Sequence, residues 1–348
     1  MTFKTSTGAL GLCCAALVTL AAPLQARDLT VVSWGGNYQD AQREIYFDPF
    51  RATGTPLLEE TWDGGYGVIA AQLQSGAPSW DVVQVETEEL MLGCADGLYE
   101  PIDWDALGGK DRFIPSAVSE CGVGAIVWST GLDYDANALK TAPTSWADFW
   151  DTKTFPGKRG LRKGPKYALE FALMADGVPA DEVYTVLATP EGVDRAFAKL
   201  EEIKDDIVWW EAGAQSIQLL ASGEVVMTSA YNGRLSGLNR TEGTNLKMVW
   251  PGSIYALDSW VILADTPNLE AAKDFLSFVN EPERQAKLPE YIAYGLPVKA
   301  SGDLLSDAQR AELPTSPENL EGAIALDGDY WVDNVEALNA RFDAWLAQ

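Results

Sequence analysis

Several aromatic and charged residues stand where an expected strand ends and a turn or helix begins. In an open α/β sheet, small molecules bind at the carboxyl ends of strands, beside helix N-termini that attract polar groups. Each of these residues could by itself be an ordinary turn residue, but six such positions together favour a shared cleft. They are Trp34, Glu86, the loop around Gly164, Gln215, Tyr231 and Asp258.

The absence of histidine limits the chemistry open to this cleft. The chain of 348 residues has no histidine, 51 acidic residues and 25 basic ones, with a formal net charge of −26. Without imidazole there is no Ser–His or Cys–His nucleophile pair, and most zinc sites are excluded. A surface this negative repels nucleic acids and anionic lipid. We therefore expect no cofactor, no metal and no nucleic-acid partner, and a cleft that holds a small polar molecule.

The first 26 residues are typical of a cleavable secretion signal. Lys4 gives a positive start, residues 8–22 are small and apolar, and Ala26 suits signal peptidase. The apolar run is short for a membrane anchor, which needs roughly 20 apolar residues. A retained anchor and lipid attachment at residues 13–14 are the alternatives. We predict a signal peptide over residues 1–26, its cleavage, and export to the periplasm.

Two cysteines, Cys94 and Cys121, remain after such a cleavage. In an oxidising compartment an isolated even pair predicts a disulfide. The alternative is a pair of buried free thiols. Two cysteines are too few for a metal cage.

Apolar strands and amphipathic helices alternate along the chain, which is typical of an α/β fold. A mature chain of this length exceeds the size at which one core stays single, so we expect two domains. No long linker separates two halves, so the chain must cross between them more than once. We expect strands at residues 29–33, 81–85, 124–130, 158–162, 207–210, 225–230, 246–250 and 258–264, and helices at 39–53, 165–174, 190–204, 216–221, 269–279 and 333–346.

Three segments carry a resemblance to a known family. They are residues 143–151 with 156–158, residues 213–227 leading to 231–233, and residues 258–262 with 271–278 and 294–297. In their order and spacing they resemble the extracellular solute-binding proteins of bacterial ABC importers, most closely the spermidine/putrescine-binding group. The likeness runs from about residue 28 to the C-terminus.

This resemblance implies two α/β lobes with a ligand held between them, without catalysis or a cofactor. It also implies that capture closes the lobes like a hinge, and that the closed form docks on an ABC permease in the inner membrane. We expect the protein to be a monomer. We expect residues 27–134 and 257–300 in one lobe, residues 135–256 and 301–348 in the other, and crossings near 131–135, 255–257 and 296–304.

The resemblance further implies which residues hold an amine. Trp34 matches a tryptophan that lies against the ligand, and an ammonium ion over an indole face gains about 0.5–2 kcal/mol. Asp258 matches the acidic residue that grips the amine, and a buried carboxylate needs a partner of this kind. Core packing of Trp34 and a helix or turn cap at Asp258 are the alternatives.

Other candidates have weaker support from the sequence. Trp209 and Trp210 alternate on one strand, so at most one faces the cleft, and Trp210 is the candidate. Glu86 could accept a second ammonium hydrogen bond, or it could be the acid of a helix N-terminus. Gln215 is a candidate by its position alone. Aromatic neighbourhoods of the family's site are matched by Tyr231, Tyr255 and Tyr294, for which ordinary packing is the alternative.

Departures from the family pattern bear on the ligand. Diamine and triamine binders place acids on the loop that here is residues 162–166, which reads Arg-Lys-Gly-Pro-Lys. The family's glutamine after a C-terminal tryptophan is matched by Val332, and its first-turn acid falls within residues 35–37. A guanidinium fork binds a carboxylate through two hydrogen bonds. Arg234 at one end of the cleft and Asp258 at the other therefore predict an ω-amino acid such as γ-aminobutyrate. A surface position is the alternative for Arg234.

Two rival functions remain open from sequence. An exported hydrolase could use Glu86 and Asp258 as its two carboxylates, because glycoside hydrolysis needs no histidine. A ferric-iron-binding protein of related architecture usually shows adjacent tyrosines at the site, and this chain has none.

Overall fold

The computed structural model describes residues 1–2, 27–76 and 78–348. Apart from its first two residues, the predicted secretion signal lies outside the described residues. In the described part of the chain, every helix is too short or too polar to cross a bilayer.

One mixed sheet runs through the molecule. The described residues form the strands β1 (Leu29–Ser33), β2 (Leu57–Thr61), β3 (Val82–Val85), β4 (Gly122–Asp135), β5 (Arg159–Arg162), β6 (Ile207–Trp210), β7 (Met227–Tyr231), β8 (Leu246–Ile262) and β9 (Ile324–Ala325). Their order is β2-β1-β3-β8-β4-β7-β5-β6, and β9 pairs with β8. Every residue of β1 and β3 is buried, as expected for apolar strands covered on both faces.

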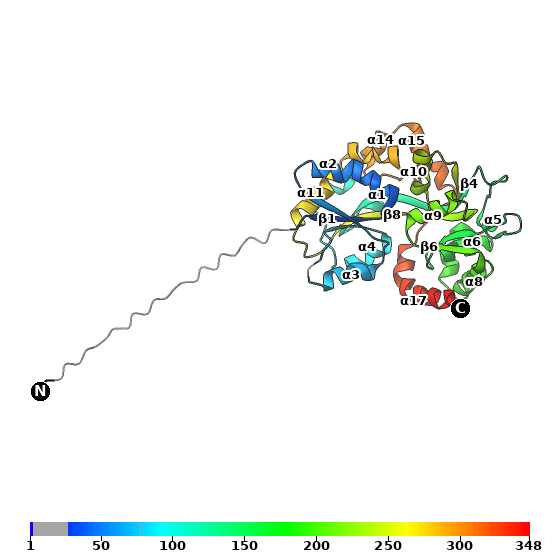
Figure 1. Cartoon of the computed structure of the whole chain (residues 1–348), viewed down its shortest axis with the longest axis horizontal. Helices are drawn as coiled ribbons and strands as arrows, with labels where there is room; N and C mark the ends of the chain where they lie inside the picture. The colour runs from blue at the N-terminus through cyan, green and yellow to red at the C-terminus, as the bar shows by residue number, and fades with distance from the viewer. Residues whose placement is uncertain (3–26, 77) are drawn as a thin grey trace.

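Helices cover the sheet in two groups (Figure 1). In Figure 1, helices α1 to α4 and α11 surround β1, and helices α5, α6, α8 and α9 surround β6. The α-helices are α1 (Gly36–Gln42), α2 (Asp48–Arg51), α3 (Tyr66–Gln74), α4 (Thr87–Ala95), α5 (Trp146–Trp150), α6 (Ala168–Ala175), α7 (Val183–Leu187), α8 (Pro190–Glu201), α9 (Gly213–Ala221), α10 (Asn232–Glu242), α11 (Leu269–Val279), α12 (Pro282–Gln285), α13 (Leu288–Tyr291), α14 (Lys299–Asp303), α15 (Asp307–Ala311), α16 (Pro317–Leu320) and α17 (Gly328–Leu346). Shorter π- and 3₁₀-helical segments are η1 (Arg43–Phe47), η2 (Lys110–Arg112), η3 (Pro115–Ala117), η4 (Ala180–Glu182) and η5 (Lys204–Asp206).

Helix α8 illustrates how the local sequence specifies an element. Its N-cap is Thr189, whose hydroxyl accepts a hydrogen bond from the Gly192 amide, and Pro190 occupies the first helical position. Both choices favour a helix start, because the cap pairs an orphan amide and proline has no amide to lose. Phe197 and Leu200 form the buried face. The helix predicted from residue 190 is therefore present, although it ends at residue 201 and not at 204.

The strands β4 and β8 join the two helix groups. They are antiparallel neighbours from Gly122–Val261 to Asp135–Leu246, and they run between the group around β1 and the group around β6. The prediction of separate strands at 246–250 and 258–264 was wrong, because β8 is continuous from Leu246 to Ile262. Pro251 and Gly252 resemble a break in the sequence, yet the strand continues through them as a bulge between the pairs Leu132–Val249 and Thr130–Ile254. The expected crossings at 131–135 and 255–257 both lie within these strands.

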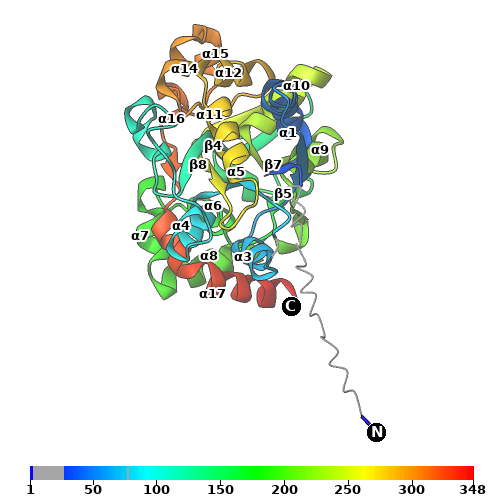
Figure 2. The same ribbon diagram turned by 90° about the vertical axis from the view of Figure 1, so that its left-hand side faces the viewer.

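The C-terminal helix α17 spans both groups. Figure 2 shows it beneath α3, α4 and α8. Near its start, a side chain at Gly328 would meet Thr87 of α4, and near its end Trp345 packs against Phe197 of α8. Between them, the indole of Trp331 donates a hydrogen bond of 2.8 Å to Glu170 of α6. The helix therefore contacts both sides of the expected lobe boundary.

Cys94 and Cys121 form a disulfide in the structure, with Cα atoms 5.9 Å apart. The bridge fixes the end of α4 to the start of β4. It therefore holds the helix whose N-terminus carries Glu86 against one of the two long strands.

Candidate functional site

A cavity lies where the carboxyl ends of β1, β3, β5 and β7 meet the middle of β4 and β8. The cavity and its mouth comprise about 450 Å³. This is the place where an open α/β sheet holds small molecules. The lining residues are Trp34, Tyr38, Trp62, Asp63, Glu86, Ile126, Trp128, Arg162, Glu211, Gly213, Tyr231, Arg234, Asp258 and Tyr294.

The carboxylate of Asp258, in the wall of the cavity, accepts hydrogen bonds from neutral donors and has no cationic partner among the described residues. It lies on β8 opposite Ile126 and is 3% exposed. Its Oδ1 accepts a hydrogen bond from Trp128 Nε1 at 2.5 Å, and its Oδ2 accepts one from Gln84 Nε2 at 3.0 Å. Burial, and then the nearby charge of Glu86, raise the pKa of Asp258 well above its usual range, although both donors oppose the shift. A cationic partner would stabilise the ionised form.

Gln84 orients this carboxylate from the neighbouring strand β3. Its Oε1 accepts hydrogen bonds from Tyr38 Oη at 3.0 Å and from Gln42 Nε2 at 2.9 Å. With the oxygen held by donors, the amide nitrogen is directed at Asp258. A buried network of this kind fixes one geometry for the carboxylate, because every member has a partner.

Glu86 is also buried but has two cationic partners. It follows β3, and its Oε1 lies 3.3 Å from Arg162 Nη1, while Oε2 contacts Lys166 Nζ. Tyr167 Oη donates to Oε2 at 3.0 Å. Burial opposes ionisation, but Lys166 and Arg162 outweigh it and lower the pKa of Glu86 to about 2. Glu86 is therefore an ionised carboxylate whose charge is already balanced within the protein.

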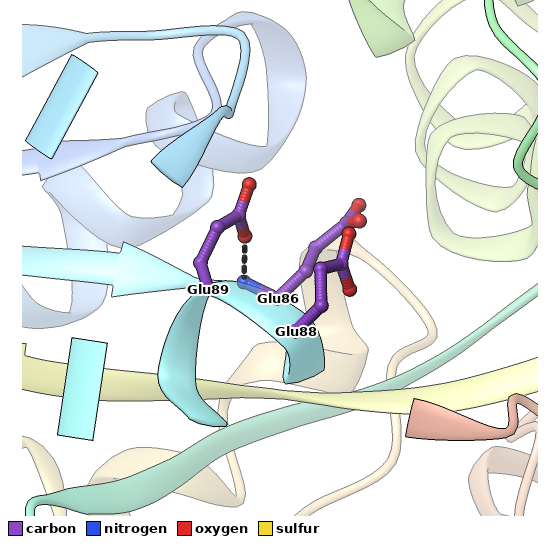
Figure 3. A group of neighbouring side chains, drawn as sticks. All are labelled: Glu86, Glu88 and Glu89. Atoms are coloured by element: carbon purple, nitrogen blue, oxygen red, sulfur yellow. Dashed lines mark hydrogen bonds between the residues drawn. The ribbon is translucent and has the colours of Figure 1, made fainter. Parts of the chain in front are cut away.

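Three carboxylates gather at the N-terminus of α4 (Figure 3). Glu86, Glu88 and Glu89 offer oxygens within 4.8 Å of one another. Oxygens of this kind suit a hard divalent cation. However, the ammonium of Lys166 contacts both Glu86 and Glu88. Glu89 points elsewhere and accepts hydrogen bonds from the amides of Gly65 and Glu86, which is a capping role. The group therefore reads as a helix cap and an ion-pair cluster.

Arg234 joins the two sides of the cavity. At the start of α10, it donates from Nη2 to the Trp34 carbonyl at 2.8 Å and from Nη1 to the Gly35 carbonyl at 2.5 Å. A side chain at Gly36, where φ is +58°, would lie 2.9 Å from Nη1, so glycine leaves room for the guanidinium. Arg234 is 3% exposed, so it is not a surface residue. Its Nε takes part in neither of these bonds and would lie 3.4 Å from a Cβ added at Gly213, which also lines the cavity.

Aromatic rings form most of the remaining wall. Trp34 stacks on Trp62 with ring centroids 5.1 Å apart. Tyr231 meets Trp128 edge to face at 5.2 Å. The buried Nε1 atom of Trp34 has no hydrogen-bond partner among the described residues. Rings in this arrangement present π faces and edges to a small cation.

Three of the residues expected at the site lie elsewhere. Trp210 is buried behind Tyr231, with ring centroids 6.1 Å apart. The side-chain oxygen of Gln215 accepts hydrogen bonds from the amides of Glu211 and Ala212, so it caps α9. Tyr255 lies on β8 between Ser129 of β4 and Ala325 of β9. In contrast, the cavity brings together six of the predicted residues, namely Trp34, Glu86, Tyr231, Arg234, Asp258 and Tyr294.

The sequence reasoning missed several lining residues. Trp128 lies inside an expected strand, and only its alternation with Ile126 on one face of β4 could have indicated it. The sequence shows that the loop with Arg162 has no acid, but it does not indicate that Arg162 itself faces the cavity as a cation. Trp62 follows the edge strand β2, which was not predicted.

Comparisons with known proteins agree with this geometry. Residues 58–315 match the family model of bacterial extracellular solute-binding proteins. The chain is 49% identical over 329 residues to the gamma-aminobutyric acid-binding protein of Pseudomonas aeruginosa, covering 94% of this chain and 93% of that protein.

Solved structures give the same result. The PBP MotA of A. tumefaciens B6, in complex with glucopine, has a TM-score of 0.85 and 30% identity, covering 92% of this chain and 100% of that chain. A GABA receptor structure has a TM-score of 0.79 and 34% identity, covering 92% and 98%. The family match does not distinguish the spermidine/putrescine-binding group from other members. The two-lobe α/β fold with a cavity at its strand ends is that of its relatives, and the chain belongs to the bacterial extracellular solute-binding proteins.

Proposed function

We propose that this protein is the periplasmic binding component of an ABC importer that captures a short ω-amino acid of the γ-aminobutyrate type. The observation that carries the proposal is Asp258, a buried carboxylate that receives hydrogen bonds from Trp128 and Gln84, both neutral donors. A ligand ammonium supplies the missing positive charge. The name of the relative at 49% identity supports the same ligand class.

In this proposal the two ends of the ligand bind different sides of the cavity. The ammonium binds Asp258, with the rings of Trp34, Trp128 and Tyr231 around it. The carboxylate binds Arg234 through Nε and the free hydrogen of Nη2, because the bonds to Trp34, Gly35 and Asn37 use the other three of its five donors. Tyr294 completes the wall. Glu86 does not bind the ligand directly but holds Arg162 and Lys166 in place beside it. The apolar middle of the ligand contacts the rings.

Export and partners follow from the family and from the sequence. Family members bind small molecules and deliver them to membrane permeases, and the names of the relatives describe binding proteins, not enzymes. We infer that residues 1–26 direct the chain to the periplasm and are removed there. We further infer that the protein is a monomer, that its lobes close on the ligand, and that the closed form docks on an inner-membrane permease.

Calorimetry with four ligands tests the assignment. We expect the wild-type protein to bind γ-aminobutyrate more tightly than putrescine, spermidine or butylamine, which lacks the carboxylate. Arg234→Ala should weaken γ-aminobutyrate at least tenfold and remove the preference over butylamine, because a charge-assisted hydrogen bond contributes about 1.5–3 kcal/mol. The matched control is Arg240→Ala, on the same helix, whose partner is Glu312 outside the cavity. Tight putrescine binding that is indifferent to Arg234→Ala would overturn the proposal.

A further inference from the structure

Lys166 places an ammonium ion beside the ligand cavity. The residue lies on the loop between β5 and α6, and its side chain is 12% exposed. Its Nζ contacts Glu86 Oε2 and Glu88 Oε1, whose side chains are 6% and 7% exposed. Figure 3 shows these two carboxylates pointing the same way. A buried carboxylate pair of this kind requires a cation.

The local backbone directs Lys166 to this place. The following residue, Tyr167, has φ of 71°, which a non-glycine side chain seldom adopts. In this conformation the hydroxyl of Tyr167 and the ammonium of Lys166 both reach Glu86. Arg162, at the other end of the loop, reaches the second oxygen of Glu86. The loop therefore presents two cations to one wall of the cavity.

The position of the Lys166 ammonium determines which charged groups of a ligand the site can accept. Glu86 lines the ligand cavity together with Asp258. Glu88 and Lys166 line the adjoining groove, which Arg162 and Asp63 share with the cavity. A second ammonium would be repelled by Arg234, so a diamine would extend toward the carboxylates at this junction. There, Lys166 pairs with Glu86 and with Oε1 of Glu88, whose Oε2 has no partner, whereas Asp258 has no cationic partner among the described residues.

We propose that Lys166 is a specificity-determining residue that occupies the position of a second ligand ammonium and so restricts the site to ligands with a single amine. This proposal rests on the proposed function above. A diamine would place its second ammonium against Lys166 and Arg162, where like charges repel at short range. Glu86 and Glu88 attract such an ammonium, but Lys166 already lies between them and contacts both. An ω-amino acid needs only Asp258 for its one ammonium and meets no such repulsion.

The test compares variants of the loop in the full mature chain. Lys166→Met should lower the ratio of the putrescine Kd to the γ-aminobutyrate Kd at least tenfold, because the second ammonium then pairs with Glu86 and Glu88. Lys166→Arg should keep the wild-type ratio, since it keeps the charge. The matched control is Lys158→Met, just before β5, an exposed residue whose partner Asp206 lies outside the cavity. An unchanged ratio in Lys166→Met overturns the proposal.

A second variant covers a failure of Lys166→Met to fold. Lys166→Gln with Glu88→Gln conserves the net charge of the cluster and leaves Glu86 with Arg162. We expect the ratio to fall, as in Lys166→Met, but by a smaller factor. An unchanged ratio in this double variant also overturns the proposal.

The same measurements distinguish a failure of the proposed function from a failure of the proposed role of Lys166. If wild-type protein ignores γ-aminobutyrate but Lys166→Met gains putrescine binding, the proposed ligand is wrong and the role of Lys166 stands. If wild-type protein binds γ-aminobutyrate and no variant binds putrescine, the proposed ligand is right and the proposed role of Lys166 is wrong.

Discussion

The indole nitrogen of Trp128 donates a 2.5 Å hydrogen bond to Asp258, across the pair of long strands β4 and β8. The donor is neutral, so it orients the carboxylate without balancing its charge. Asp258 consequently stays at the centre of the cavity with a pKa raised by burial and by the nearby Glu86. In the proposed function, the binding free energy of the ligand ammonium depends on this unbalanced charge.

Replacing Asp258 by asparagine should abolish capture and leave the fold intact. The raised pKa means that the folded state already favours an uncharged group at this position, so Asp258→Asn should unfold at the same temperature as the wild type or a higher one. We expect γ-aminobutyrate affinity to fall at least a hundredfold, because loss of one partner of a buried charge pair costs about 3–5 kcal/mol. Calorimetry and thermal unfolding measure the two effects. Wild-type affinity in Asp258→Asn would refute this assignment.

Ligand binding should release a proton. In the free protein, burial raises the pKa of Asp258, and a bound ammonium lowers it again. Affinity should therefore rise with pH until the pKa of the free protein is passed, and then level off. The released proton makes the measured binding heat depend on the ionisation enthalpy of the buffer, so parallel titrations in phosphate and Tris detect it. Equal heats in both buffers at every pH would contradict the expectation.

Loss of the Trp128 donor should weaken binding without abolishing it. In Trp128→Phe the ring is kept but Asp258 loses its hydrogen bond at Oδ1, so the ionised form is less stable and the pKa rises further. We expect affinity to fall about tenfold or more, since a hydrogen bond to a charged group contributes about 1.5–3 kcal/mol. The control is Trp104→Phe, whose indole donates to the Ser119 carbonyl. The pH at which affinity levels off should move upward in Trp128→Phe alone.

Glu170 should make stability depend on pH. Burial raises the pKa of Glu170 to about 7, and its Oε2 has no partner among the described residues. Because the folded pKa is above the unfolded value, the contribution is present below about pH 4.5 and is lost as pH rises through 7. Glu170→Gln should therefore stabilise the protein by about 3 kcal/mol at pH 8 and have little effect at pH 5.

Urea unfolding at both pH values measures this effect. The amide oxygen still accepts from Trp331 and Tyr184, so the docking of α17 is preserved. The matched control is Glu201→Gln, whose carboxylate accepts from Trp345 at the exposed end of α17. Equal stabilisation of Glu170→Gln at the two pH values would show that the charge of Glu170 is not the cause.

The Cys94–Cys121 disulfide should stabilise the fold without touching the ligand. The bridge closes a loop with a sequence separation of 27. A closed loop of this size stabilises by about 3 kcal/mol through the unfolded state. We expect the double variant Cys94→Ala/Cys121→Ala to lose about that free energy of unfolding and to keep its γ-aminobutyrate affinity. Two titratable thiols in the native protein would contradict the pairing.

The sequence predicted the strand ends better than the path between them. Trp34, Glu86, Tyr231 and Arg234 were recognisable because a polar or aromatic residue after an apolar run marks a strand end. The continuity of β8 was not recognisable, because Pro251-Gly252 has the local signature of a turn. Residues 250–253 have no partner on β4, and it is the long-range pairing of Val249 and Ile254, on either side of them, that keeps the strand continuous.

Long-range pairing also explains the site residues that sequence reasoning missed or displaced. The sequence predicts Gln215 in the cleft, but its oxygen accepts from the two amides that precede its own helix, which is a local arrangement. In the sequence, Lys166 only shows that this loop lacks the acids of diamine and triamine binders. That it meets Glu86 and Glu88 depends on how two distant loops approach each other, and nothing in the local sequence records this.

The pairing of β4 with β8 has a mechanical consequence. The two strands that connect the halves are hydrogen-bonded side by side, not separate tethers. A two-stranded ribbon bends out of its own plane with little loss of bonding, whereas sliding one strand along the other would break the whole ladder. We therefore predict that the proposed opening of the halves bends this strand pair, and that substitutions at Gly131, where an added Cβ would lie 3.1 Å from Ser253 Cβ, change the speed of that bending from outside the cavity.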